Sequence, residues 1–237
     1  MDMNTGNLKL IGLLFGVIML ASGSVQAQTP KVWITAGAKG GVGGNYLSVP
    51  DMLIEADGVP FNDGGGGIGG GGGIFGEVRF LQQHLGFEMD LLLDGNKTWC
   101  SINDVDFIMK YTQLRIPLLL KGSLVSGITR VSLGIGPEFR VGLNASTDID
   151  PADDVPAIVR DGFKADAVGG VGLAWEFALA FMLSPIEITV DLRFAYNASL
   201  EKDFEDRIDR DTRIYEATHS VDGRIMIGVG YVFTAGK

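Results

Sequence analysis

The sequence is poor in cysteine, in basic residues and, after its N-terminal segment, in long hydrophobic runs. Its single cysteine, Cys100, excludes an internal disulfide and a cysteine-based metal cluster. Nineteen basic against 29 acidic residues give a formal net charge of −10, so the chain lacks the basic surface that nucleic-acid binding requires. Hydrophobic residues make up 46% of the 237, more than a disordered chain carries. Nucleic-acid-binding and disordered classes are therefore excluded.

The first 27 residues have the pattern of a secretory signal peptide. Lys9 precedes an apolar run over residues 10–21, and Val25 and Ala27 suit a cleavage site. The run is shorter than the roughly 20 residues that span a bilayer as a helix, so we expect cleavage after Ala27 rather than an N-terminal anchor. One domain would then cover residues 28–237. No later stretch is apolar enough for a transmembrane helix, so membrane insertion would require a closed β-barrel.

Eight segments alternate hydrophobic residues with polar or small ones at a period of two, which indicates β-strands. In residues 186–197 the alternation is complete, with Ile188 and Val190 on one face and Asp191 and Arg193 on the other. The expected strands cover residues 31–42, 74–81, 85–93, 108–121, 130–144, 163–180, 186–197 and 221–233.

Short and long connections alternate between these strands. The short ones are residues 82–84, 122–129 and 181–185, and the long ones are 45–73, 94–107, 145–162 and 198–218. Short turns at one end and long loops at the other are typical of outer-membrane barrels. The long connections hold 19 acidic and 6 basic residues, so the acidity of the chain lies mainly in them.

Large apolar residues occupy one face of the strands, whereas glycines and sparse charges occupy the other. A narrow barrel interior suits that second face better than the charged exterior of a β-sandwich does. The predicted fold class is all-β: an eight-stranded antiparallel up-and-down transmembrane β-barrel with long extracellular loops and short periplasmic turns. A soluble sandwich or a soluble barrel is the alternative.

Five segments carry a resemblance to a known family. They are YTQLRIPLLLKGS at 111–123, LGIGPEFRVGL at 133–143, VGGVGLAWEF at 168–177, ITVDLRFAYN at 188–197 and IGVGYVF at 227–233. Together they resemble the PorT-like outer-membrane β-barrel domain of Gram-negative bacteria. The resemblance covers the second half of the chain. It departs from the usual barrel ending, because four residues follow the aromatic Phe233.

The resemblance implies a small barrel that is exported through the periplasm and inserted into the outer membrane. Periplasmic chaperones and the barrel-assembly machinery are its expected partners during biogenesis, and outer-membrane lipid and lipopolysaccharide its expected surroundings. It implies no single biochemical activity, and we expect a monomer.

Two segments are candidates for ligand binding. The glycine tract 64–73 lacks the Lys-Ser/Thr of a phosphate-binding loop, so we expect a flexible loop before the second strand. The acidic cluster Asp148, Asp150, Asp153 and Asp154 lacks the glycine and the terminal glutamate of an EF-hand. We expect a solvated acidic loop there, with weak binding of the divalent cations that bridge lipopolysaccharide as the functional alternative.

A hydrolytic site has few candidates. The two histidines are His84, in a short turn, and His219, beside Ser220 in the last strand. Neighbours in a strand point to opposite faces, so His219 and Ser220 cannot act as base and nucleophile together. We therefore expect no catalytic residue, no cofactor and no metal centre.

The small-residue face of the strands carries six basic and seven acidic residues. They are Lys39, Glu77, Arg79, Glu88, Asp90, Arg115, Glu138, Arg140, Glu176, Glu187, Asp191, Arg193 and Arg224. The interior of an eight-stranded barrel is only wide enough for side chains, so we expect these charges to pair across the lumen and plug it.

The sequence therefore predicts a non-enzymatic outer-membrane protein with a structural or surface-interaction role. A narrow pore or small-solute transporter is the main alternative, and a lipid-modifying barrel enzyme is a further one.

Overall fold

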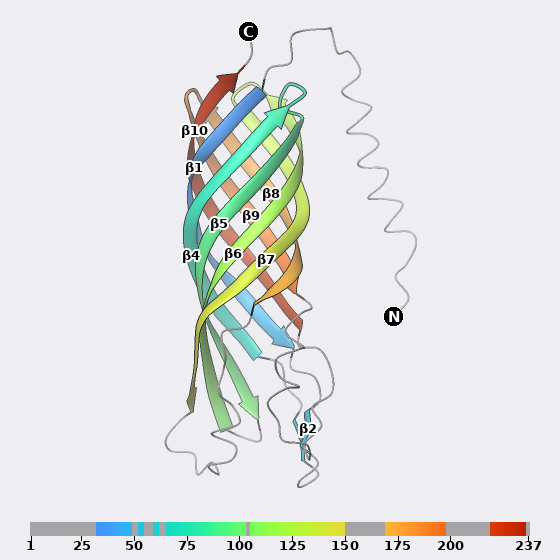
Figure 1. Cartoon of the computed structure of the whole chain (residues 1–237), viewed down its shortest axis with the longest axis vertical. Helices are drawn as coiled ribbons and strands as arrows, with labels where there is room; N and C mark the ends of the chain where they lie inside the picture. The colour runs from blue at the N-terminus through green and yellow to red at the C-terminus, as the bar shows by residue number, and fades with distance from the viewer. Residues whose placement is uncertain are drawn as a thin grey trace, which may run out of the picture.

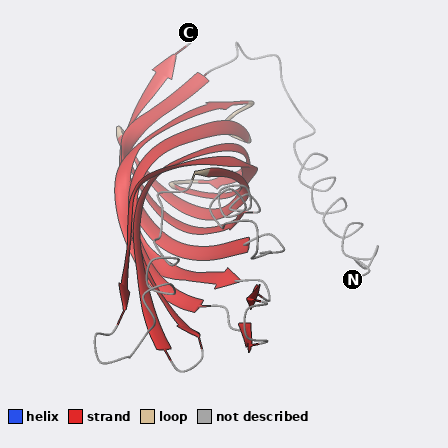
Figure 2. Ribbon diagram, turned by 60° about the horizontal axis from the view of Figure 1, so that its bottom comes forward, coloured by secondary structure: helices blue, strands red, loops and turns tan. Residues whose placement is uncertain are grey.

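The computed structural model describes residues 32–48, 52–54, 59–61, 65–102, 105–149, 169–197 and 219–235. Within them, eight strands form a closed antiparallel barrel in the order β1-β10-β9-β8-β7-β6-β5-β4 (Figures 1 and 2). The strands are β1 Val32–Ser48, β4 Gly65–Phe80, β5 Leu85–Ile102, β6 Val105–Ser126, β7 Thr129–Ile149, β8 Gly170–Leu183, β9 Ile186–Asn197 and β10 His219–Ala235. The predicted eight-stranded up-and-down barrel is confirmed.

Two further strands, β2 Met52–Ile54 and β3 Val59–Phe61, lie between β1 and β4 in the sequence. They pair with each other in a separate two-stranded sheet. Among the described residues, no helix is long and apolar enough to cross a membrane. The predicted signal peptide, with its cleavage site at Ala27, lies outside the described residues, as does the connection 198–218.

Three tight turns join strands at one end of the barrel, the end at which β1 begins and β10 ends (Figure 1). The turn between β4 and β5 contains three consecutive residues in the left-handed region. They are Leu81, Gln82 and Gln83, with φ of 50°, 57° and 72°. Gly127 supplies the left-handed position, φ 58°, in the turn between β6 and β7. Glycine suits this conformation because it has no Cβ to clash with the backbone.

The prediction of a long loop over residues 94–107 is wrong, because strands occupy nearly all of this segment. β5 continues to Ile102 and β6 starts at Val105, and these two residues pair with each other. Beyond Leu93 the next two outward positions of β5 are Gly95 and Lys97, and a large apolar residue returns only at Trp99. The contrast between the two faces weakens there, so alternation no longer marks the strand.

The prediction of a flexible loop over the glycine tract 64–73 is also wrong. The residues of the tract from Gly65 onward belong to β4, and those from Gly66 onward pair with both β1 and β5. A Cβ at Gly73 would lie 1.9 Å from the carbonyl oxygen of Leu91, and one at Gly69 would lie 2.0 Å from Oδ1 of Asn96. Glycine is therefore required on the inner face of this wall, where backbone and side chains approach too closely for any Cβ.

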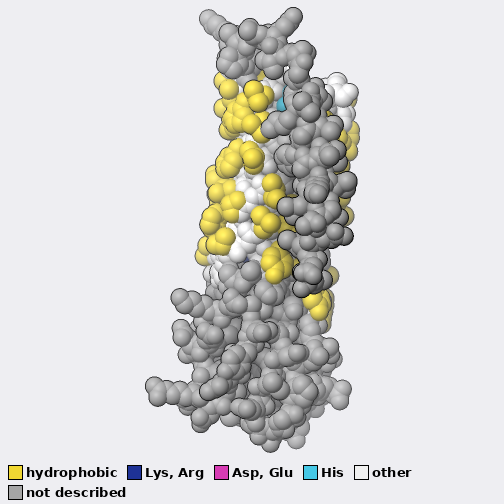
Figure 3. Space-filling view, turned by 90° about the vertical axis from the view of Figure 1, so that its right-hand side faces the viewer, with side chains coloured by type: hydrophobic (Ala, Val, Ile, Leu, Met, Phe, Trp, Pro, Cys, Tyr) yellow, Lys and Arg dark blue, Asp and Glu magenta, His cyan; other side chains and the backbone are white. Residues whose placement is uncertain are grey.

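The distribution of side chains is the reverse of that in a soluble protein. Large hydrophobic side chains point outward, for example Leu93 at 54% exposure, Leu133 at 37% and Ile227 at 60%. The described surface in Figure 3 accordingly shows many hydrophobic side chains among backbone and other uncharged groups. Buried positions are mostly polar or charged. The buried apolar side chains include Phe75, Leu92 and Met226 and a small cluster of Leu119, Ala174 and Ala195.

Candidate functional site

The candidate site is the charged interior of the barrel. All thirteen charged residues predicted for the small-residue face point inward; twelve are buried and Arg140 is partly buried. Period-two alternation places them, because each strand turns every second side chain inward. Four further charged residues join them: Asp94, Lys121, Arg130 and Asp222. We call these eight basic and nine acidic residues the lumen network.

The turn-side tier of the lumen network is a ring of two arginines and two glutamates. Arg130 donates to both carboxylate oxygens of Glu77 at 2.8 Å, and its Nη2 also reaches Oε1 of Glu187 at 2.7 Å. Arg79 donates to Oε2 of Glu187 at 2.7 Å and to Oγ1 of Thr35 at 2.5 Å. Its Nε lies 3.8 Å from Oε2 of Glu77, which closes the ring.

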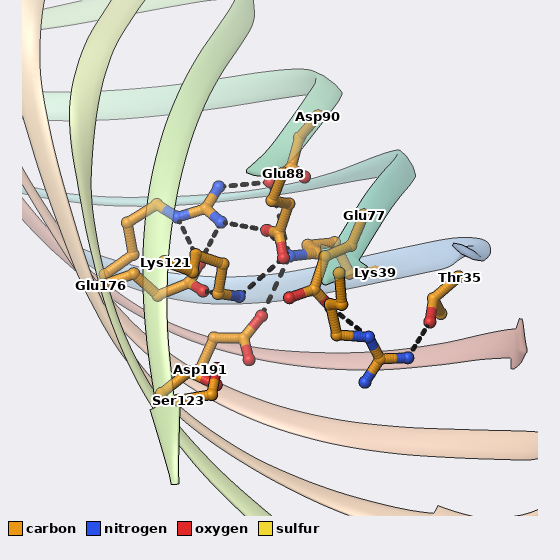
Figure 4. Close-up of polar contacts among 12 residues, drawn as sticks. Thr35, Lys39, Glu77, Glu88, Asp90, Lys121, Ser123, Glu176 and Asp191 are labelled. Carbon is orange, nitrogen blue, oxygen red and sulfur yellow. Dashed lines mark hydrogen bonds and ion pairs between the residues drawn. The ribbon is translucent and has the colours of Figure 1, made fainter. Parts of the chain in front are cut away.

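The middle tier contains three basic and four acidic residues. They are Lys39, Lys121, Arg193, Glu88, Asp90, Glu176 and Asp191. Figure 4 shows labelled members of this tier, with side chains from several strands converging inside the barrel.

Glu88 is the centre of the middle tier. It accepts from Lys39 at 2.6 Å, from Lys121 at 2.7 Å and from Arg193 at 3.2 Å. Arg193 also donates to Asp90 at 2.6 Å and pairs closely with Glu176. One carboxylate therefore ties together three cations from three different strands.

The loop-side tier contains three arginines and three carboxylates. They are Arg115, Arg140, Arg224, Asp94, Glu138 and Asp222. Arg115 donates to Glu138 through two nitrogens, at 3.0 and 2.9 Å, and its Nη1 lies 2.8 Å from Asp222. Arg140 donates to Asp222 at 2.5 Å, and Arg224 pairs closely with Asp94.

Charge is balanced in two tiers and unequal in the third. The middle tier has one more acid than base, and Oδ1 of both Asp90 and Asp191 accepts no hydrogen bond from the described residues. Burial of an ion is costly unless it is paired and hydrogen-bonded. The three tiers meet this requirement for most of their charged atoms by linking opposite walls of the barrel.

The sequence prediction omits four members of the lumen network, although the strand pattern places three of them on the inward face. Asp222 already lay on the polar face of its expected strand, and Lys121 and Arg130 lie at the ends of expected strands on the inward parity. Asp94 was assigned to a long loop, and the extension of β5 brings it inside. Inward parity, continued beyond the apolar part of each strand, would have identified all four.

The other candidate residues lie apart from the lumen network. Asp148 is exposed on β7 and pairs with Lys110 on β6, whereas Asp150, Asp153 and Asp154 lie outside the described residues. Within the described part of the chain, no group of three or more His, Cys, Asp or Glu residues could hold a metal ion.

Of the two histidines, only His84 has a described side chain, and its ring contacts a backbone carbonyl rather than a nucleophile. Nδ1 of His84 lies 3.0 Å from the carbonyl oxygen of Ser123, in the turn region. The hydroxyl of Ser220 is buried and accepts from Asn197 at 3.1 Å. The side chain of His219 lies outside the described residues.

Comparison with known proteins gives only distant likenesses. No family model and no curated protein matches the sequence. Neisserial surface protein A is 10% identical, with a TM-score of 0.39 over 84% of this chain and 96% of that one. The translocator domain of the autotransporter NalP from Neisseria meningitidis is 10% identical, with a TM-score of 0.32 over 96% of both chains. The outer membrane protease OmpT from Escherichia coli is 9% identical, with a TM-score of 0.30 over 90% of this chain and 100% of that one.

These likenesses include a surface protein and a protease and transfer neither activity.

Proposed function

We propose that this chain is a non-enzymatic outer-membrane β-barrel protein of a Gram-negative bacterium, with a closed lumen and a structural or surface-interaction role. The observation that carries the proposal is the combination of an apolar barrel exterior with three tiers of buried ion pairs inside. A barrel that faces hydrocarbon satisfies every backbone group through its strand pairing and needs apolar side chains on its outer face.

The membrane location is supported by the exposed side chains. Outward residues such as Leu93, Ile135 and Ile227 are 54%, 46% and 60% exposed, and many others surround them over all eight strands. Soluble monomers rarely expose contiguous apolar patches larger than a few hundred Å². The expected signal peptide and the resemblance to the PorT-like family favour the outer membrane, reached with the help of periplasmic chaperones and the barrel-assembly machinery.

The closed lumen distinguishes this proposal from a pore. In the turn-side tier, Arg130 on β7 contacts Glu77 on β4 and Glu187 on β9, so one side chain connects three parts of the wall. The middle and loop-side tiers repeat such cross-lumen contacts further along the barrel. A solute would have to break several buried ion pairs in succession, and each break leaves charges without partners.

Conductance in a planar lipid bilayer tests the closed lumen. We expect the inserted wild-type protein to give no stable current steps above the membrane baseline. A variant with Glu88→Ala and Arg193→Ala, which removes the centre of the middle tier, serves as the matched comparison. Large and stable steps from the wild-type protein would overturn the closed lumen and favour the narrow pore.

The surface role is tested separately by deletion of residues 198–218, with deletion of residues 150–168 as the comparison. We expect both deletion variants to form the folded barrel. Deletion of residues 198–218 should reduce surface adhesion more than deletion of residues 150–168 does. Lipid processing that the wild type performs and His219→Ala abolishes would contradict the non-enzymatic role.

A further inference from the structure

The charged side chains that the structure describes on the outer surface of the barrel lie in one place. Among the Lys, Arg, Asp and Glu side chains that the structure describes, three point outward: Lys97 on β5, Lys110 on β6 and Asp148 on β7. All the other described ones belong to the lumen network. The three lie on adjacent strands toward the long-connection end, and we call them the rim cluster.

The rim cluster lies at the edge of the apolar surface, where Lys97 pairs with Ile68 of β4, which is 61% exposed. On β5 the last large apolar residue before it is Leu93, 54% exposed, and Lys97 follows four residues later. At about 3.3 Å per residue this is about 13 Å along a tilted strand, which reaches the headgroup layer of a bilayer whose hydrocarbon ends near Leu93. Trp99, 41% exposed on the same face, is the residue type that favours this interface.

The two lysines lie directly opposite each other. Lys97 pairs with Lys110 in the β5–β6 register, and both point to the same outer face. Like charges in this position destabilise a sheet unless another group compensates them. Lys97 lies over the ring of Trp99, 4.9 Å from its centroid, and Lys110 pairs with Asp148. The rim cluster therefore keeps a formal charge of +1.

A β-bulge brings Asp148 to the outer face. Even-numbered residues of β7 such as Glu138 point into the lumen, but the register shifts where β7 passes Thr112 and Gln113. Beyond this shift Ser146 pairs with Lys110, which points outward, so Asp148 also points outward. Its carboxylate then competes with any external anion for Lys110.

We propose that Lys97 and Lys110 bind the phosphate of a lipid in the outer leaflet, with the acyl chains of that lipid against the apolar wall below. This inference rests on the proposed membrane location. Excess positive charge favours an anion, and its position directly above an apolar surface favours an anion that is attached to hydrocarbon. Two ammonium groups on adjacent strands have six N–H donors, of which one is given to Asp148 and up to five are left for the phosphate oxygens.

The experiment measures binding of lipid A to the purified, folded full-length protein in uncharged detergent micelles by native mass spectrometry. The probes are bisphosphorylated lipid A and the same lipid without phosphate. The variants are Lys97→Gln/Lys110→Gln, the charge-conserving Lys97→Arg/Lys110→Arg, and Asp148→Asn. A heat-dependent gel shift for each variant shows whether the barrel has folded.

We expect the wild type to prefer the phosphorylated probe and the Gln pair to lose about fivefold in affinity for it per lysine. The Arg pair retains the preference, and Asp148→Asn strengthens it because Lys110 loses its competing carboxylate. Equal binding of both probes by the wild type, or unchanged binding by a folded Gln pair, would overturn the lipid-phosphate site. Complete displacement by millimolar inorganic phosphate would assign the lysines to free phosphate instead.

Failure of this site leaves the proposed function intact if the variants still fold and insert. Recovery of the wild type as a water-soluble protein would remove the basis of both proposals, so the two failures are distinguishable.

Discussion

Arg193 on β9 donates to Asp90 on β5 at 2.6 Å, although three strands separate β9 from β5 in either direction around the barrel. The pair therefore crosses the full width of the lumen. The side chain of Arg193 is 1% exposed and that of Asp90 is 0% exposed. Arg193 also forms ion pairs with Glu88 and Glu176. A single guanidinium group therefore connects opposite walls of the barrel through three carboxylates.

Loss of this guanidinium should destabilise the barrel strongly. Arg193→Met leaves three buried carboxylates short of a partner, and we expect a loss of about 3–5 kcal/mol in the free energy of unfolding. Urea-induced unfolding in phosphatidylcholine vesicles, followed by tryptophan fluorescence, measures it. Lys110→Gln is the control, because its pair with Asp148 is exposed and contributes about 0–1 kcal/mol. Equal stability of Arg193→Met and the wild type would contradict a network that holds the walls together.

The ring in the turn-side tier should show coupling between its members. Arg130 binds both oxygens of Glu77, so removal of either residue alone leaves the other buried charge short of its main partner. We expect the double variant Arg130→Met/Glu77→Leu to be less destabilised than the two single variants added together, by about 0.5–3 kcal/mol. A double-mutant cycle on the unfolding free energies measures this coupling. Strict additivity would show that the two side chains do not interact.

The glycines of β4 should differ sharply in their tolerance of a methyl group. Gly73→Ala places a Cβ 1.9 Å from the backbone oxygen of Leu91, whereas Gly76→Ala places one where nothing lies within 4 Å. We expect Gly73→Ala to prevent formation of the folded, heat-modifiable species and Gly76→Ala to leave it intact. The fraction of shifted protein on an unheated gel is the measurement. Similar folding of the two variants would refute a close approach at Gly73.

A charge on the outer wall should be costly despite being exposed. Ile227 lies at the middle of β10 and is 60% exposed. In water, Ile227→Arg would change stability by only about 0.5 kcal/mol. At the midplane of a bilayer it should cost about 2–4 kcal/mol. Unfolding in vesicles, with Ile227→Leu as control, separates a membrane barrel from a soluble one, since a neutral effect of the arginine would favour the soluble barrel.

Strand positions were predictable because alternation is a local property of the chain. Residues 186–197 show this most clearly: the predicted strand and β9 have the same bounds. The inward residues followed from the same parity. The strand over the glycine tract was not predictable in this way, because glycine has a low strand propensity and the tract shows no alternation. The need for Gly73 comes from Leu91 on the neighbouring strand.

The pairing of the lumen charges was also beyond the sequence. Alternation places Arg193 on the inner face but does not say that it meets Asp90, which is 103 residues away. That contact depends on the closure and stagger of the barrel. The outward position of Asp148 depends on a bulge between β6 and β7, which leaves no clear mark in the sequence.

The central claim is a closed barrel in the outer membrane, and a heat-modifiability gel on fractionated cells tests it most directly. We predict that the protein is found in the outer-membrane fraction and that its band migrates differently before and after boiling. Recovery of the unheated protein in the soluble periplasmic fraction, with the same migration before and after boiling, would contradict the claim.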